Sequence, residues 1–250
     1  MGSSVLTHAG DSMHPAKYVY IVAHRGASRL AIENTRAAFE AAIKPGVDFI
    51  ETDVRRTGDG ILVLHHDADA FGELIAQSSF HNLLQLSRAK NSDLTTLEEL
   101  LTLARGRIRL DIELKEAGYE EEVVGRLQRA GMQEDDFVIT TFRDDSLRGF
   151  KALYPAARCG LLIEDNRDSP ASGGDQVLTE RLKQANADFV AAKASLVSLG
   201  FAEQLWDQGY PVWVWTVDDP EQIAKFLRIP GVQAVITNRP DLAVEARSKN

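Results

Sequence analysis

Residues 107–115 read Arg-Ile-Arg-Leu-Asp-Ile-Glu-Leu-Lys. Charged and apolar side chains alternate along this stretch, which is the pattern of a β-strand with one polar and one apolar face. Asp111, Glu113 and Lys115 therefore share a face, and the apolar residues between them pack outward against helices. In a closed barrel such a charged face lies on the inner side near the mouth, so the stretch predicts a barrel with a polar opening.

The sequence on either side repeats one kind of unit. Apolar runs rich in β-branched residues alternate with segments of helical period, which is typical of successive βα units on a parallel sheet. The 250 residues predict a single-domain α/β fold, the (β/α)8 TIM barrel, over residues 18–245, preceded by a disordered tail over residues 1–17. The predicted strands are 18–23, 47–53, 61–66, 107–115, 137–142, 158–163, 188–192, 211–217 and 233–237.

These nine candidate strands are one more than an eight-stranded barrel needs, and the sequence leaves open which one lies outside it. The link from Asp53 to Ile61 is too short for a crossover helix, so we expect an extended or irregular return there. We expect Asn34 to cap one helix and Thr96–Glu99 to form a capping box. Further helices are predicted over 118–130, 143–153, 176–187, 199–208 and 219–228, and a loop over 164–175.

The composition is that of an ordinary globular protein, with 44% hydrophobic and 26% charged residues. The net charge of −9 argues against nucleic acid or an anionic membrane as a partner, because no basic excess is available to neutralise phosphates. The sequence contains no run of about 18 apolar residues, so we expect no integral membrane association. The single cysteine, Cys159, excludes an internal disulfide and suits the cytoplasm. The oligomeric state is left open.

Acidic side chains gather where the expected barrel mouth lies. Glu51 and Asp53 end one strand and are two residues apart, so both face the same way. With Glu113 they form an oxygen-only set, which suits one hard divalent cation, Mg²⁺ or Ca²⁺, better than zinc. Buried charges are costly unless they pair or bind a metal. We therefore predict a metal site at these three residues.

Histidines follow two of the predicted strands. His24 comes directly after strand 18–23, and His65 and His66 end strand 61–66. Imidazoles titrate near neutral pH, as a general acid and a general base must. Because side chains alternate along a strand, only one of His65 and His66 can face the interior. The following Asp67 favours His66.

Basic side chains accompany the acidic set. Arg25 follows the first strand directly and Lys115 ends the fourth, so both can hold phosphoryl oxygens. Each feature also has a purely structural interpretation: Lys115 could simply pair with Glu113, a strand-end histidine or acidic pair could be solvated, and Trp213 and Trp215 could be core. Four consecutive strands with polar ends, however, favour phosphoryl chemistry.

A series of short motifs stands in a fixed order over residues 20–243. They are Ala23-His-Arg-Gly-Ala27 with Glu33-Asn34-Thr35, Glu51-x-Asp53, His66-Asp67, Ile112-Glu113-Leu114-Lys115, Trp215-Thr216-Val217-Asp218 and Ile236-Thr237-Asn238-Arg239-Pro240. In order and spacing they resemble the glycerophosphodiester phosphodiesterase family. Each motif alone is weak, but the ordered set is specific.

The resemblance implies metal-dependent hydrolysis of glycerophosphodiesters to glycerol 3-phosphate and an alcohol. The implied site residues are Glu51, Asp53 and Glu113 for the metal, His24 and His66 as the acid/base pair, Arg25 and Lys115 for the phosphoryl oxygens, and Trp215 for the alcohol side. Whether water or a neighbouring hydroxyl of the substrate attacks is left open. Glu33 and Asn34 are expected to shape the loop after the first strand.

The chain departs from the family pattern at two places. Residues 68–94 are short where the family carries a larger insertion that covers the site, and Thr141 stands where serine is common before Phe142. A more open mouth would admit a longer tail, so a lysophospholipase D-like activity is one alternative. A phosphodiester-binding barrel without catalysis is another, although the complete set of histidines and carboxylates disfavours it. A zinc amidohydrolase-type barrel is disfavoured because the first strand lacks paired histidines two residues apart.

Overall fold

The computed structural model describes residues 18–164 and 175–249. The expected tail over residues 1–17 and most of the expected loop over 164–175 lie outside the described residues. Among the described helices, none combines the length and the apolar character that a membrane crossing requires.

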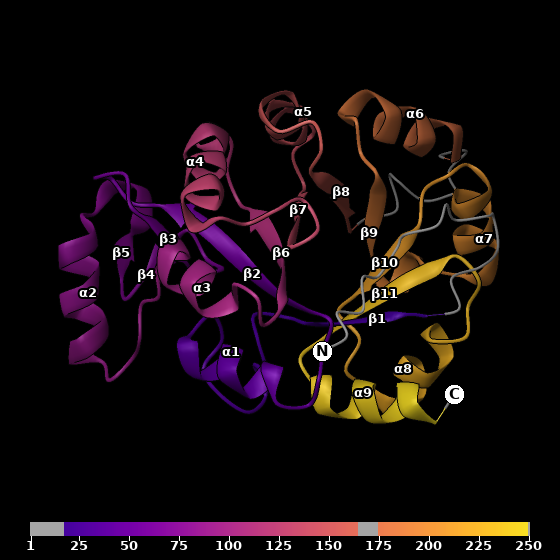
Figure 1. Ribbon diagram of the computed structural model, residues 1–250, viewed down its shortest axis with the longest axis horizontal. Helices are drawn as coiled ribbons and strands as arrows, with labels where there is room; N and C mark the ends of the chain where they lie inside the picture. The colour runs from indigo at the N-terminus through magenta and orange to yellow at the C-terminus, as the bar shows by residue number, and fades with distance from the viewer. Residues whose placement is uncertain (1–17, 165–174, 250) are drawn as a thin grey trace, which may run out of the picture.

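Parallel strands form a closed ring at the centre of the molecule, with helices around them (Figure 1). The ring closes where β1 pairs with β2 on one side and with β11 on the other. This arrangement confirms the expected (β/α)8 TIM barrel. In order around the ring the strands are β1 (Tyr20–Ala23), β2 (Phe49–Arg56), β6 (Arg109–Leu114), β7 (Phe137–Thr141), β8 (Arg158–Ile163), β9 (Phe189–Lys193), β10 (Val212–Trp215) and β11 (Val232–Thr237).

The surplus candidate strand is 61–66. Its core, β3 (Leu62–Leu64), pairs antiparallel with the end of β2, so it lies outside the parallel ring. The expectation that His66 ends a barrel strand was therefore wrong. The reason is the short link before Ile61: the chain makes a tight turn in which Thr57 N donates to Ile61 O over 2.9 Å, and then runs back along β2.

Helices connect the barrel strands and cover their outer side (Figure 1). The capping box predicted at Thr96 is present, because its hydroxyl accepts from Glu99 N while the Glu99 carboxylate accepts from Thr96 N. Each cap satisfies backbone groups that a helix end leaves unpaired. The helices are α1 (Arg36–Ile43), α3 (Leu97–Ala104), α4 (Glu120–Ala130), α5 (Asp144–Leu153), α6 (Asp175–Ala185), α7 (Leu199–Asp207), α8 (Pro220–Phe226) and α9 (Pro240–Ser248), with a short 3-10 turn η4 (Ala194–Leu196) after β9.

One predicted cap is corrected. The N-cap of α1 is Thr35, whose hydroxyl accepts a hydrogen bond from Ala38 N, and not Asn34. Asn34 lies one residue earlier with a φ of 56°, in the left-handed region that asparagine tolerates better than most residues. This backbone conformation leaves the Asn34 side chain to contact the barrel interior, so its role belongs to the site.

Two apolar layers stabilise the barrel. The larger one lies between the strands and the surrounding helices, and it includes Leu110, Ile112 and Leu114 of β6, which were expected to face outward. The smaller one fills the inside of the ring. Its members include Val22, Phe49, Val138, Phe189, Ala191 and Trp213. Trp213 is fully buried there, as the structural interpretation of this residue required, so the interior is packed and the polar strand ends lie above it.

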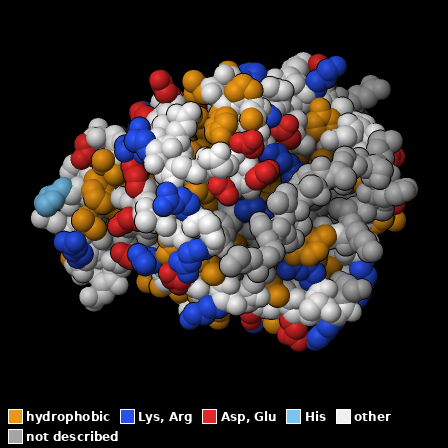
Figure 2. Space-filling view, viewed as in Figure 1, with side chains coloured by type: hydrophobic (Ala, Val, Ile, Leu, Met, Phe, Trp, Pro, Cys, Tyr) orange, Lys and Arg blue, Asp and Glu red, His pale blue; other side chains and the backbone are white. Residues whose placement is uncertain are grey.

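Residues 65–94 form a small insertion between β3 and α3, at the left edge of the view in Figure 1. It contains β4 (Asp69–Ala70), β5 (Glu73–Leu74), η1 (Ile75–Gln77) and α2 (Phe80–Ala89). A separate apolar cluster, with Val63, Ile75 and Leu83 among its members, stabilises it. On the face drawn in Figure 2, Lys and Arg side chains are interspersed with Asp and Glu, and apolar groups lie between them.

Candidate active site

The strand ends bring the predicted acidic residues together. Along β2 and β6, Asp53 pairs with Glu113, and Glu51 pairs with Asp111 in the layer below. All four side chains are buried, with at most 8% of their residue surface exposed. The predicted alternation therefore holds: the carboxylates face the interior of the barrel, while the residues between them face outward.

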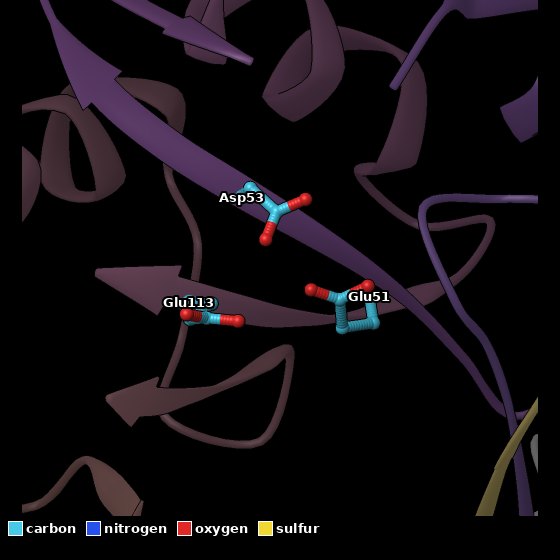
Figure 3. A group of neighbouring side chains, drawn as sticks. All are labelled: Glu51, Asp53 and Glu113. Atoms are coloured by element: carbon cyan, nitrogen blue, oxygen red, sulfur yellow. The ribbon is translucent and has the colours of Figure 1, made fainter. Parts of the chain in front are cut away.

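Glu51, Asp53 and Glu113 can share one ion. Each offers a carboxylate oxygen, and the three oxygens lie within 4.8 Å of one another. Figure 3 shows Glu51 and Asp53 on one strand with Glu113 on its neighbour, their carboxylates directed toward a common space. An all-oxygen set of this kind fits a hard divalent cation.

The electrostatics of this cluster require positive charge. Burial and the repulsion of Asp53, Asp111 and Glu113 raise the pKa of Glu51 well above its ordinary value. Burial and Asp53 raise the pKa of Glu113 to about 7. Burial alone would raise the pKa of Asp53 too, but Lys115 and Arg25 outweigh it and lower that pKa. Glu51 Oε1 is buried without a hydrogen-bond partner among the described residues, which suits an oxygen that binds a cation.

Two cations flank the carboxylates. Lys115 Nζ lies 2.7 Å from Glu113 Oε1 and 3.3 Å from Asp53 Oδ1. Arg25 Nε lies 3.2 Å from Asp53 Oδ2, and the Arg25 backbone N donates to Glu51 Oε2 over 2.8 Å. The ion pair between Lys115 and Glu113 is thus real, but it lies in the wall of a cavity, where both cations can also meet an anionic ligand.

His24 is held in a defined tautomer. Its Nδ1 lies 2.8 Å from Asn238 Oδ1, while Asn238 Nδ2 donates to Asp218 Oδ2 over 2.7 Å. Because the amide oxygen faces His24, Nδ1 carries the hydrogen and Nε2 is left as the acceptor. Burial and Arg25 lower the pKa of His24 below its ordinary value, although Asn238 raises it. At neutral pH this imidazole can accept a proton.

His66 and His65 occupy different surroundings. His66 lines the cavity, and its Nδ1 forms a 2.8 Å hydrogen bond with Asp67 Oδ1. His65 is not among the cavity residues; its ring packs edge-on against Phe71, with ring centroids 6.3 Å apart. The structure therefore places His66, and not His65, at the cavity, although the strand before it lies outside the ring.

The cavity has a volume of about 320 Å³ and two unlike walls. The residues of its polar wall are His24, Arg25, Glu51, His66, Asp111, Glu113, Lys115, Thr140 and Glu164. The other wall is apolar, and its residues are Phe142, Leu162, Trp215 and Ile236. Trp215 is fixed by a 2.9 Å hydrogen bond from its Nε1 to Ala191 O and by edge-on contact with Phe142. Phosphate and an organic group can be bound side by side in such a cavity.

Sequence reasoning missed two asparagines that orient site residues. Asn34 Nδ2 donates to Asp53 Oδ2 over 2.8 Å, and its Oδ1 accepts from Thr52 Oγ1 over 2.8 Å. Asn238, together with Asp218, orients His24. All of these residues except Thr52 occur in the motifs quoted above, and this was the signal by which the sequence could have indicated them. Their contacts could not be predicted, because they depend on the closed barrel.

Comparisons with known proteins match this arrangement. The profile of the "Glycerophosphoryl diester phosphodiesterase family" matches residues 24–242. A glycerophosphodiester phosphodiesterase from Bacillus altitudinis is 29% identical over 250 residues, covering 92% of this chain and 98% of the relative. One from Caldanaerobacter subterraneus is 27% identical over 243 residues, covering 90% and 96%.

Solved structures show the same fold. A phosphodiesterase from Oleispira antarctica, in complex with the product sn-glycerol-3-phosphate, has a TM-score of 0.80 at 25% identity and covers 92% of this chain and 96% of that chain. A glycerophosphodiester phosphodiesterase from Thermotoga maritima has a TM-score of 0.75 at 27% identity, covering 91% and 98%. The likeness therefore extends over nearly the whole barrel.

Proposed function

Because the chain belongs to the glycerophosphoryl diester phosphodiesterase family and hydrolyses glycerophosphodiesters, we propose that Glu51, Asp53 and Glu113 hold the divalent cation of this reaction. The products are glycerol 3-phosphate and an alcohol, in line with the product bound in the Oleispira antarctica structure. The observation that carries the proposal is the cluster of three buried carboxylates, two of which, Glu51 and Glu113, line the cavity together with Arg25 and Lys115.

Mg²⁺ or Ca²⁺ is the ion we propose, because the three ligands are oxygens and no sulfur or imidazole takes part in the set. When bound, the cation supplies Lewis-acid stabilisation of the charge on the phosphoryl oxygens. Arg25 and Lys115 neutralise the remaining charge on these oxygens. The phosphodiester then lies against the polar wall.

His24 is the general base in this proposal. Its Nδ1 is bonded to Asn238, and its Nε2 makes no hydrogen bond within the described residues, so Nε2 can accept the proton of the attacking hydroxyl, whether of water or of the substrate. His66 is the general acid. Asp67 hydrogen-bonds to its Nδ1 and orients the ring, so that its Nε2 can give a proton to the leaving alcohol. Trp215 and the rest of the apolar wall would contact that alcohol.

The apolar wall also supports a second substrate class. In a lysophospholipid the hydrocarbon chain is on the glycerol side. If the substrate is bound with that side, instead of the leaving alcohol, against Phe142, Leu162, Trp215 and Ile236, a lysophospholipase D-like activity is the second candidate. Release of choline from glycerophosphocholine and from lysophosphatidylcholine separates the two activities. We further propose the reducing cytoplasm as the compartment, because the only cysteine, Cys159, is free and buried.

The direct test of the function is a panel of glycerophosphodiesters assayed for glycerol 3-phosphate. We expect release in the presence of Mg²⁺ or Ca²⁺, complete loss after treatment with a chelator, and recovery when the cation is returned. An enzyme-coupled assay of glycerol 3-phosphate measures this. Undiminished release in excess chelator would contradict a metal-dependent reaction.

Asn34→Ala is expected to weaken cation binding by about 10- to 100-fold, because groups that orient metal ligands typically contribute this much. The substitution removes the hydrogen bond that fixes Asp53. Titration calorimetry with Mg²⁺ or Ca²⁺ measures the change without relying on activity. Asn91→Ala is a matched control, since Asn91 is exposed and has a similar φ of 49°. An equal loss in both variants would assign the effect to backbone strain.

A further inference from the structure

One buried carboxylate in the cavity has no role so far. Asp111 is 1% exposed and lines the cavity. Thr140 Oγ1 donates to its Oδ1 over 2.7 Å, which fixes the orientation of the side chain. Its Oδ2 is buried without a hydrogen-bond partner among the described residues. The structure thus presents one satisfied oxygen and one unsatisfied oxygen on a fixed side chain.

The position of Asp111 separates it from the metal set. It pairs in register with Glu51 and lies one inward-facing position before Glu113 along β6, on the side of the packed interior. It is not a member of the three-carboxylate cluster. In the described part of the chain, no lysine or arginine forms a salt bridge with it, since Lys115 pairs with Glu113 and Asp53 instead.

A buried polar atom without a partner is rare in native proteins and costly, so Asp111 Oδ2 requires a hydrogen-bond donor that the described part of the protein does not provide. The donor must be small enough to enter the cavity and must reach below the phosphoryl group that Arg25 and Lys115 hold. The glycerol moiety of a glycerophosphodiester meets both conditions, because it carries two hydroxyls next to the phosphate. The apolar wall leaves the other side of the phosphate for the variable alcohol.

We propose that Asp111 is a specificity-determining residue that accepts a hydrogen bond from a glycerol hydroxyl of the substrate. This inference rests on the proposed function and deepens it, because it assigns the glycerol moiety to the deep end of the cavity. A site built to pair with a substrate hydroxyl rejects an analogue that lacks it, since the buried acceptor is then left without a partner.

Two diesters with the same leaving group test the proposal. They are the p-nitrophenyl phosphodiester of glycerol and that of 1-propanol, which differ only in the hydroxyls. The wild type should prefer the glycerol diester in kcat/KM. Asp111→Asn keeps an oxygen for Thr140 and removes the free acceptor, so it should lower kcat/KM for the glycerol diester by roughly 10- to 100-fold and for the propyl diester by less than about threefold.

Further variants keep the result interpretable. Asp111→Val removes both side-chain oxygens and should also abolish the preference for the glycerol diester over the propyl diester. Asp136→Asn is the control, because Asp136 directly precedes β7 at the end that is remote from the cavity. It should leave the ratio of the kcat/KM values for the two diesters unchanged. The rise in Tm on adding Mg²⁺ or Ca²⁺ should persist in Asp111→Asn, because Asp111 is not a ligand.

Equal losses on both diesters, an unchanged preference, or loss of the metal-induced rise in Tm would each overturn the role of Asp111 while leaving the proposed function intact. A wild type that cleaves neither diester would overturn the proposed function, and the inference with it.

Discussion

Glu113→Gln is expected to lower kcat/KM for glycerophosphodiesters by about 10³-fold or more at saturating Mg²⁺ or Ca²⁺. The amide has nearly the shape of the carboxylate but no charge, so the proposed site keeps its packing and loses one of the three negative charges that would bind the cation. A metal ion that polarises a phosphoryl oxygen contributes several kcal/mol to the transition state, and about 1.4 kcal/mol corresponds to tenfold in rate. Steady-state kinetics with glycerophosphocholine measure the loss.

Glu98→Gln is the matched control for Glu113→Gln, and the cation-induced rise in Tm is a second readout. Glu98→Gln makes the same chemical change on α3, where Glu98 pairs with Arg126 away from the cavity, and it should leave kcat/KM within about twofold. The cation-induced rise in Tm should shrink in Glu113→Gln and persist in Glu98→Gln. Full turnover by Glu113→Gln would refute the metal assignment.

Much of the barrel could be predicted because its signals are local. The alternation through residues 107–115 needs only neighbouring side chains, and it correctly placed Asp111 and Glu113 inside and Ile112 outside. The capping box at Thr96 is equally local. Fold class and inner face therefore follow from short windows of sequence.

The place of 61–66 could not be settled in this way. This segment has the apolar composition of a barrel strand, and only its pairing direction differs. That direction depends on a turn in which Thr57 Oγ1 accepts from Ile61 N over 2.9 Å. The short link before Ile61 was the visible hint, because a parallel neighbour requires a longer crossover.

The supporting contacts of the site also escaped prediction, for a related reason. Asn34 and Asp53 are 19 positions apart, and His24 and Asn238 are 214 apart. The second pair meets only because β1 and β11 are neighbours in the closed ring, where Ala23 pairs with Thr237. Residue types at strand ends can be read from a sequence, whereas contacts across the closure depend on the complete fold.

His66→Ala is expected to lower kcat by about 10²- to 10⁴-fold for diesters whose leaving group is an alkyl alcohol such as choline. An alkoxide is a poor leaving group and needs a proton, which His66 supplies in the proposed mechanism. p-Nitrophenolate leaves without one, so the same variant should lose much less activity on glycerol p-nitrophenyl phosphate. His24→Ala removes the proposed general base and should lose activity on both substrates alike.

The contrast between leaving groups distinguishes the two imidazoles in a way that a simple loss of activity does not. His65→Ala is the matched control, because His65 precedes His66 directly but packs against Phe71 outside the cavity residues, and it should stay within about threefold of the wild type. A larger loss from His65→Ala than from His66→Ala would reverse the choice between them. Equal losses of His66→Ala on both substrates would instead show that His66 does not protonate the leaving group, since an acid is needed only where the departing oxygen is strongly basic.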